Sequence, residues 1–291
     1  MDILCPCCES KKTDCILTNY YNYDLVSCQD CQCVFCYPFK APGVDFYSEA
    51  DDWESIRRHS IISKWHKSHP TWKSNNLLDG HGKVLLDIGC GNGDFVEFAS
   101  MRNFSTIGID IDKASLKIAD RRQLVNAQFV NTTLLDFAKT NKQKFDIISM
   151  FEVFEHLDNP KETLEIICSL LKPGGLFIGS LPNENRFLSK KLNLSFALPP
   201  YHLTYWTKDS WTNYLQMNQF EKIYCENTAY YGYVSDLLYY KFIERFKKIG
   251  TNKILSTFAK AFFVFPKKME MLIEKGVGKS SSFYFEFKNM G

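Results

Sequence analysis

Two C-x-x-C pairs near the start of the chain have the residue type and spacing of a metal site. Cys5 and Cys8 form the first pair, and Cys28 and Cys31 form the second. Residues 9 to 27 lie between them, a separation that suits two tight turns closing around one tetrahedral zinc ion. Four thiolates leave no open position for water or substrate, so we expect the zinc to be structural.

Three further cysteines in this region leave alternatives open. Cys33 or Cys36 could replace one of the four ligands, Cys7 is left over, and reduced core cysteines are the alternative to a metal site. The chain has 11 cysteines, crowded toward its start, and this distribution in a long chain without a secretory signal favours metal over disulfides. The segment "NYYNYDLVSCQDCQCVFCYP" predicts a strand that enters the second turn and one that leaves it, which gives a ribbon over residues 1–40.

A glycine-rich turn follows the apolar segment Val84–Ile88 in "KVLLDIGCGNGDF" and precedes an amphipathic helix. Gly89, Gly91 and Gly93 permit positive φ and close approach of the backbone to a ligand at a helix amino terminus. A dinucleotide fingerprint would need its third glycine at Asp94, so the spacing disfavours NAD. The next strand, in "FSTIGIDID", ends at Asp110, whose carboxylate could accept both hydroxyls of a ribose.

The segment "FDIISMFEVFEHLDNPKETLEIICSLLKPGGLFIGSLPN" predicts a strand, a loop, a helix, a glycine turn and a strand. Phe145–Met150 and Leu176–Leu181 are apolar runs of the kind covered on both faces, which indicates a doubly wound parallel α/β sheet. The loop Met150–His156 leaves the carboxyl end of its strand, where ligands bind in such sheets. Near the carboxyl terminus, a capped helix, a strand and the closing strand "SSSFYFEFKN" complete the sheet.

Composition excludes several classes of protein. The chain has 291 residues, 45% hydrophobic, and a formal charge of +2, which gives no overall attraction to nucleic acid or anionic lipid. We find no signal sequence and therefore expect a cytoplasmic protein. A basic, aromatic-rich helical insertion at about 231–279 is expected to form a substrate lid, a homodimer contact or a peripheral membrane contact, and burial in protein is favoured.

The motifs "LLDIGCGNG", "GIDID", "FDIISMFEVFEHLDNP" and "LKPGGLF", in this order, resemble the class I S-adenosylmethionine-dependent methyltransferases. The resemblance implies a Rossmann-like, seven-stranded methyltransferase domain over residues 81–291, preceded by a helical linker at 41–80 that covers the cofactor. Members of this family usually read the adenine amino group with an Asp after the third strand, where this chain has Thr133, with Asp136 as the alternative or as a helix cap. The implied cofactor residues are Asp87, Gly89, Gly91, Gly93, Asp110, Ile111, Thr133, Phe151, Glu152 and, in the linker, Tyr47.

More specifically, the two cysteine pairs, the linker "VDFYSEADDWES", the "EVFEHL" loop and "LPPYHLTYWT" resemble zinc-ribbon sugar methyltransferases of deoxysugar and surface polysaccharide biosynthesis. This implies a small-molecule or nucleotide-linked sugar as acceptor. Relatives of that kind carry a glutamate-histidine pair where this chain has Tyr201 and His202. Because the glutamate is associated with carbon methylation, its absence favours methylation of oxygen.

His202 is the predicted general base, since a histidine near neutral pH can accept the proton of a sugar hydroxyl. Packing in an aromatic cluster is the alternative role, and His156 is the rival base. Two other functions remain open: a zinc-ribbon methyltransferase acting on ribosomal RNA, disfavoured by the small net charge, and a cofactor-binding protein without catalysis.

Overall fold

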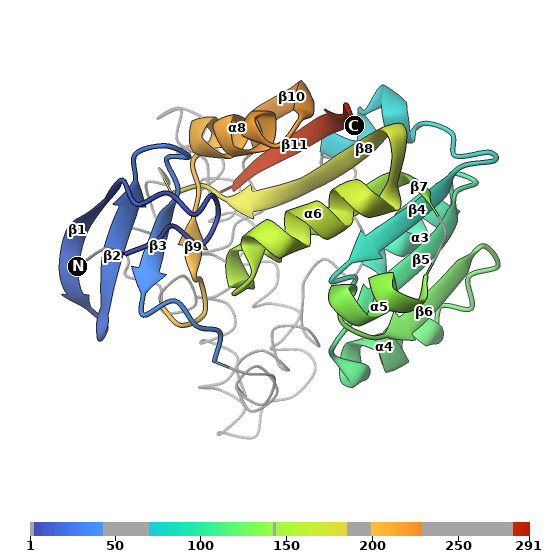
Figure 1. Ribbon diagram of the computed structural model, residues 1–291. Coiled ribbons are helices and arrows are strands. Elements are labelled where there is room, and N and C mark those ends of the chain that lie inside the picture. Colours follow the sequence, from blue (N-terminus) through green and yellow to red (C-terminus); the bar gives the residue numbers. More distant parts are fainter. Residues whose placement is uncertain (1–2, 43–69, 142–143, 185–198, 229–281) are drawn as a thin grey trace, which may run out of the picture.

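The computed structural model describes residues 3–42, 70–141, 144–184, 199–228 and 282–291. Within these ranges a seven-stranded sheet has the order β10-β11-β8-β7-β4-β5-β6 (Figure 1). Its strands are β4 (Val84–Ile88), β5 (Ser105–Asp110), β6 (Ala127–Asn131), β7 (Phe145–Phe151), β8 (Leu171–Pro182), β10 (Phe220–Thr228) and β11 (Ser282–Asn289). Strands β4 to β8 are parallel, and β11 is antiparallel to both neighbours. The predicted doubly wound, Rossmann-like sheet of seven strands is confirmed.

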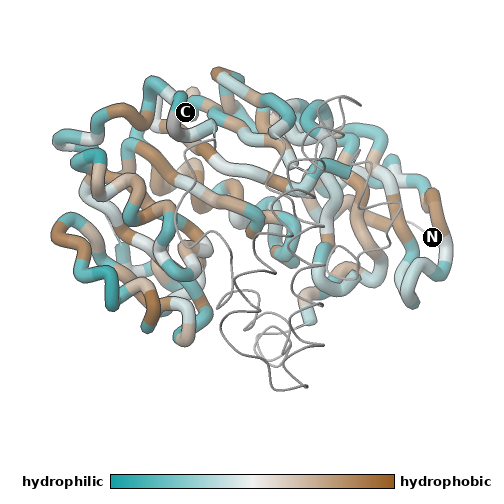
Figure 2. The backbone as a smooth tube through the Cα atoms, turned by 180° about the vertical axis from the view of Figure 1, so that it is seen from behind, coloured by the Kyte–Doolittle hydropathy of each residue, from teal (hydrophilic) through white to brown (hydrophobic). Residues whose placement is uncertain are grey.

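Helices cover both faces of this sheet, as its apolar strands require. They are α3 (Asp94–Ser100), α4 (Lys113–Asp120), α5 (Leu134–Thr140), α6 (Pro160–Leu170) and α8 (Lys208–Met217). On β4, Leu85 belongs to the same core cluster as Phe95 of α3, whereas the adjacent Leu86 shares a cluster with Leu164 of α6. Alternate residues of one strand therefore serve opposite layers, and the tube in Figure 2 is largely brown and white along the inner strands.

The helix starts are specified locally. The Asp112 carboxylate accepts the amides of Ala114 and Ser115 at the start of α4, and Thr207 and Ser210 form a capping box on α8. Near the start of β8, its pairing with β7 passes from Leu171 to Leu176, so the predicted glycine turn is looped out of the ladder with Gly174 at φ 74°. The cap of α8 and the glycine turn were predicted from the sequence, and the Asp112 cap was not.

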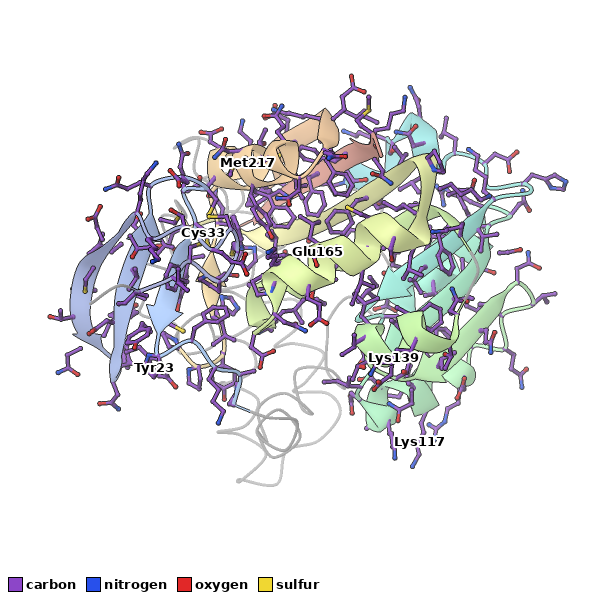
Figure 3. All side chains as sticks on the ribbon, viewed as in Figure 1. Tyr23, Cys33, Lys117, Lys139, Glu165 and Met217 are labelled. Atoms are coloured by element: carbon purple, nitrogen blue, oxygen red, sulfur yellow. The ribbon has the colours of Figure 1, made fainter. Side chains whose placement is uncertain are left out.

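The amino-terminal residues form a second, antiparallel sheet. Its strands are β1 (Thr13–Tyr20), β2 (Tyr23–Cys28) and β3 (Val34–Tyr37). Strands β2 and β3 match the two predicted around the second knuckle, and β1 was not predicted. A fourth strand, β9 (Thr204–Tyr205), comes from the other end of the chain and pairs with β3 (Figure 1). In Figure 3, Cys33 lies where the ribbon meets the body of the molecule. The amino-terminal sheet therefore includes residues far beyond the predicted ribbon boundary at residue 40.

Several sequence predictions lie outside the described residues. These are the position of Tyr47, most of the linker 41–80, and the insertion at 231–279. The described end of the linker contains two short helices, η1 (Pro70–Trp72) and η2 (Asn75–Leu77). Among the helices that the structure describes, none combines the length and apolar character needed to cross a membrane.

Candidate functional site

The glycine turn lies between β4 and α3, at the carboxyl edge of the sheet. Gly89, Gly91 and Gly93 have φ of 70°, 51° and 77°, in the left-handed region that favours glycine. A Cβ on Gly89 would stand 2.4 Å from Cγ2 of Val153, whereas one on Gly91 would meet nothing within 4 Å among the described residues. A side chain at position 89 would collide with Val153 in the neighbouring loop, so glycine is required there. The absence of a side chain at Gly91 leaves room for a ligand beside the backbone.

Asp110, at the end of β5, holds the glycine turn in place. Its two carboxylate oxygens accept the amides of Gly91 and Asp112, each at 2.8 Å. A carboxylate offers about four acceptor positions, so hydrogen bonds to these two amides are compatible with further bonds to ligand hydroxyls. The next residue, Ile111, is 45% exposed and offers an apolar surface beside the carboxylate. This arrangement fits the predicted ribose and adenine contacts.

Asp87 is buried in β4, below the glycine turn. It accepts a 2.7 Å hydrogen bond from Oγ of Ser149, its register partner on β7. Burial raises the pKa of Asp87 to about 7, with Asp110 adding to the rise and the Ser149 hydroxyl opposing it. A cationic ligand group nearby would favour the ionised carboxylate, so the residue suits a ligand that carries positive charge.

The residues after β6 form the N-terminal cap of α5. Thr133 is the N-cap of α5, because its Oγ1 accepts the amide of Asp136. The expectation that Asp136 itself forms the cap is wrong, since it occupies the third helical position and its carboxylate contacts Lys139 and Thr133. The side chain of Thr133 is committed to this cap, and its role toward a cofactor stays a prediction.

The loop after β7 approaches the glycine turn through Val153. The ring of Phe151 packs against Phe95 at a centroid distance of 4.6 Å. Glu152 has φ 54°, donates its amide to the carbonyl of Ser180, and accepts the Ser180 hydroxyl at 2.8 Å. Glu152 therefore lies at the carboxyl edge, fixed to β8, while Phe151 contributes its side chain to packing.

Beyond this loop, three ionisable side chains converge. Nε2 of His156 lies 3.7 Å from Oε1 of Glu155, and Nε2 of His202 lies 3.9 Å from the same oxygen. The two imidazole rings meet edge to face at a centroid distance of 4.9 Å. Glu155 and His202 are buried, with side chains 2% and 7% exposed. Both predicted base candidates therefore belong to one cluster, centred on a carboxylate.

Hydrogen bonding distinguishes the two histidines. Nδ1 of His156 donates to the carbonyl of Tyr201 at 2.6 Å, which leaves its Nε2 as an acceptor when the ring is neutral. Burial lowers the pKa of His156 to about 4, so this ring is neutral at physiological pH. His156 braces the backbone immediately before His202. The ligand atoms of Glu155, His156 and His202 all lie within 4.8 Å of one another, so the cluster could also hold a metal ion.

Reasoning from sequence missed Glu155 and Val153. Glu155 sits beside His156 in "FEHL", and its signal was a carboxylate in a loop that leaves a parallel strand. The missing information was the approach of His202 from another segment. Val153 gave no chemical signal, because its role is steric contact with Gly89.

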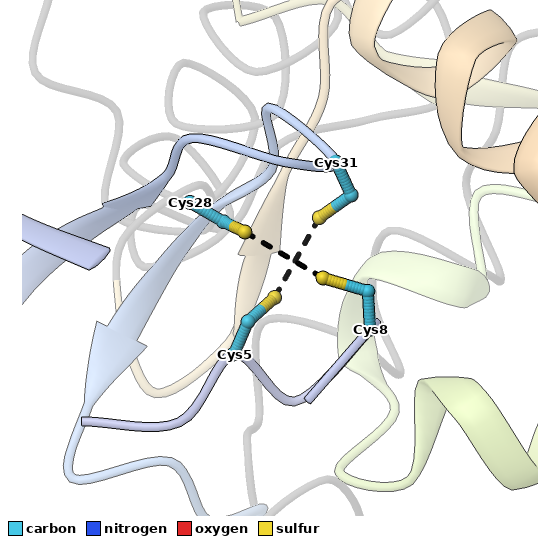
Figure 4. A group of neighbouring side chains, drawn as sticks. All are labelled: Cys5, Cys8, Cys28 and Cys31. Carbon is cyan, nitrogen blue, oxygen red and sulfur yellow. Dashed lines mark hydrogen bonds between the residues drawn. The ribbon is translucent and has the colours of Figure 1, made fainter. Parts of the chain in front are cut away.

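The cysteine quartet assembles as predicted. The four Sγ atoms of Cys5, Cys8, Cys28 and Cys31 lie within 4.8 Å of one another and point toward a common centre (Figure 4). Cys5 and Cys31 are 3.6 Å apart, as are Cys8 and Cys28. Tetrahedral bonds of about 2.3 Å give sulfur separations of about 3.8 Å, so the quartet fits zinc.

The remaining ribbon cysteines lie outside this quartet. The Cys7 thiol donates to the sulfur of Cys33, which in turn donates to the carbonyl of Val34. Burial raises the pKa of both Cys33 and Cys36 to about 12, which keeps these two thiols protonated. They behave as core thiols, and neither is needed as a replacement ligand.

A protein family described as "Methyltransferase domain" matches residues 71–224, more than half of the chain. The chain belongs to this family. The matched range holds the glycine turn, Asp110, the Glu155 loop and His202, and ends within β10. The predicted class I methyltransferase fold is therefore confirmed.

Among curated relatives, a ubiquinone biosynthesis O-methyltransferase of Saccharophagus degradans is 36% identical over 117 residues, or 38% of this chain and 50% of that protein. A protein of the same name from Acinetobacter baylyi is 28% identical over 152 residues, or 46% of this chain and 64% of that protein. The chain thus spans about half to two thirds of the length of these relatives. Their names contain no sugar.

Two solved structures share the fold. A phosphoethanolamine N-methyltransferase of Haemonchus contortus, in complex with S-adenosylmethionine, has a TM-score of 0.59 at 18% identity, covering 85% of this chain and 60% of its own. A cyclopropane synthase of Mycobacterium tuberculosis has a TM-score of 0.58 at 14% identity, covering 84% and 95%. At these identities the likeness establishes the fold alone.

Proposed function

We propose that this protein transfers a methyl group from S-adenosylmethionine to a hydroxyl oxygen of a small-molecule acceptor, with His202 as general base. The observation that carries the proposal is the buried Glu155 carboxylate 3.9 Å from His202, close to the carboxyl edge where the cofactor turn lies. Methyl transfer from a sulfonium is a displacement in which the protein must align the acceptor and remove its proton.

The cofactor residues are supported by the fit of the glycine turn. Gly91 offers an approach for the methionine portion, Asp110 and Ile111 suit the ribose and adenine, and Asp87 suits the positive charge. When bound, S-adenosylmethionine supplies the electrophilic methyl group. Tyr47, Thr133, Phe151 and Glu152 stay predictions for this site.

The role of His202 is supported by its neighbours. When an imidazole accepts a proton it becomes cationic, and a buried carboxylate close by stabilises that charge. The sequence has Tyr201 directly before His202, and the carboxylate close to His202 comes instead from Glu155 in the loop after β7. His156 is the weaker candidate for the base, because burial lowers its pKa to about 4 and the Tyr201 carbonyl occupies its Nδ1.

The acceptor has two candidate classes. Sugar hydroxyls are predicted from the zinc ribbon and "LPPYHLTYWT", and the relatives' names do not support them. Hydroxyls of ubiquinone precursors are favoured by those names, which describe O-methyltransferases of ubiquinone biosynthesis, and phenols serve as probes for this class in the test below. Oxygen as the methylated atom is common to both classes.

The test is methyl transfer from isotope-labelled S-adenosylmethionine to a panel of nucleotide sugars and catechols, with ribosomal RNA in parallel, read by mass spectrometry. Label on a hydroxyl oxygen of a sugar or a phenol supports the proposal and selects the acceptor class. Label on carbon, on RNA alone, or cofactor binding without turnover on any acceptor would contradict it.

A further inference from the structure

The chain segment that carries His202 is held from two sides. On one side, the amide of Leu203 donates to the carbonyl of Glu155 at 2.8 Å. On the other, the carbonyl of Leu203 accepts the amide of Cys36, in the zinc ribbon, at 3.0 Å. Leu203, the residue after His202, thus bonds to the Glu155 loop through its amide and to the ribbon through its carbonyl.

The ribbon contact continues along strand β9. Phe35 pairs with Thr204 and Val34 pairs with Tyr205, and the backbone of Tyr205 hydrogen bonds to the sulfur of Cys33. Phe35 and Thr204 are both almost fully buried, at 0% and 1% exposed. Strand β9 has only two residues and lies at the edge of this sheet, next to β3. Among the described strands, its backbone pairing therefore comes from β3.

The cysteine knuckles fix the ribbon to the body of the protein. Glu9, just after the first knuckle, forms an ion pair with Lys161 of α6. The carbonyl of Asp30, inside the second knuckle, accepts a hydrogen bond from Asn213 of α8. A zinc ion bound by the quartet would join these two anchored turns, and β3 begins three residues after Cys31. Zinc would thus set the position of β3 relative to the sheet.

We propose that the zinc ribbon is a positioning element of the active site: strand β3 holds β9 and so fixes His202 against Glu155. The inference rests on the proposed role of His202. Its consequence is that zinc controls turnover through the acceptor side of the site, whereas the cofactor residues on β4 and β5 are independent of the ribbon. A displacement of a catalytic group by about 1 Å can lower the rate about 100-fold.

The test compares Cys8→Ser with Cys15→Ser. Cys8 belongs to the quartet, and Cys15 is an exposed cysteine of the same ribbon outside it. We expect Cys8→Ser to lose zinc, to lower kcat by about 100-fold and to change the Kd of S-adenosylmethionine by less than about twofold. Hydrogen exchange over residues 199–206 should quicken, while exchange over β7 should not. Cys15→Ser should match the wild type in all four measurements.

Combining Cys8→Ser with His202→Ala separates this inference from the proposed function. If the ribbon acts through His202, the double variant should be no slower than His202→Ala alone, because residues that act as a unit are non-additive. Unchanged kcat and exchange in Cys8→Ser overturn the ribbon inference and leave His202 untouched. Normal kcat in His202→Ala, with a slow Cys8→Ser, overturns the base assignment instead. Loss of cofactor binding in Cys8→Ser also contradicts the inference, since the ribbon would then support the whole fold.

A second variant covers the case in which Cys8→Ser fails to fold. Phe35→Ala leaves all four thiolates in place and removes the buried ring at the β3–β9 pair. It should retain zinc and cofactor affinity but lower kcat, and Phe35→Leu should restore most of the loss. A normal kcat in Phe35→Ala, with quickened exchange over residues 199–206, would overturn the inference.

Discussion

The Glu155 carboxylate and the His202 imidazole lie 3.9 Å apart, although the first belongs to the loop after β7 and the second precedes β9. A buried carboxylate carries a large desolvation cost unless it has a partner. Here Nε2 atoms of two histidines lie within 4 Å of the same Glu155 oxygen. In the proposed reaction, this cluster would accept the proton of the acceptor hydroxyl and stabilise the resulting imidazolium charge.

Replacing Glu155 with glutamine should lower kcat by about tenfold or more, because the charge that stabilises the protonated base is removed while its shape is kept. The acid limb of the kcat-pH profile should move to lower pH, and the Kd of S-adenosylmethionine should stay unchanged. Glu165→Gln, an exposed site on α6, is the matched control (Figure 3). A Glu155→Gln enzyme with wild-type kcat and pH profile would exclude this role.

Asp110→Asn should weaken the binding of S-adenosylmethionine by about 10- to 100-fold, because hydrogen bonds to a charged carboxylate contribute about 1.5–3 kcal/mol. The glycine turn should also loosen, since asparagine keeps only one acceptor oxygen for the amides of Gly91 and Asp112. Asp120→Asn, at an exposed carboxylate that ends α4, is the control, and Asp136→Asn separately tests the adenine assignment. Isothermal titration calorimetry of these variants measures the Kd of S-adenosylmethionine. Equal Kd values for Asp110→Asn and the wild type would refute the ribose contact.

Asp87 should make cofactor binding depend on pH. Its pKa of about 7 in the folded protein lies above the ordinary value of 3.8, so the folded state holds a proton that the unfolded state releases. The resulting stability is complete below about pH 4 and is lost as pH rises to about 7, by about 4 kcal/mol.

A cationic cofactor favours the ionised carboxylate, so binding below pH 7 should release a proton and tighten as pH rises toward 7. Titration calorimetry in two buffers of different ionisation enthalpy measures the proton. Asp87→Asn should show the same Kd at pH 5.5 and 7.5. Proton release that persists in Asp87→Asn would assign the effect to another group.

Gly89→Ala should destabilise the fold by about 1–3 kcal/mol more than Gly82→Ala. Both glycines have φ near 70°, but an added Cβ meets Val153 at 2.4 Å only at Gly89, and at Gly82 it meets nothing within 4 Å among the described residues. The shared φ makes Gly82→Ala a control for backbone strain. Urea unfolding of the two variants gives the difference, and equal losses would mean that the Val153 loop yields without cost.

The elements that the sequence predicted well are those whose signals are local. Strand Val84–Ile88, the glycine turn and the strand end at Asp110 all follow from an apolar run and its next few residues. The four zinc ligands follow from spacing within two short turns. The helix cap at Thr133 was also local, and it was missed because Asp136 was weighed only as a cap or a ligand.

The relationships that were missed join distant segments. Nothing local indicates that Thr204–Tyr205 would extend the ribbon sheet, since a two-residue strand has no periodicity of its own. The meeting of Glu155 with His202 depends on that pairing and on the loop after β7. Steric contacts such as Gly89 with Val153 carry no chemical signature at all. Tertiary pairing, more than composition, decides these positions.

Removal of the acceptor proton by His202, as proposed, can be measured by single-turnover methyl transfer in His202→Gln on the acceptor selected from the panel. We expect the rate to fall by about 100-fold or more, with an unchanged Kd for S-adenosylmethionine and a normal rate for the exposed control His81→Gln. A wild-type rate in His202→Gln, with zinc and cofactor bound, would contradict the account.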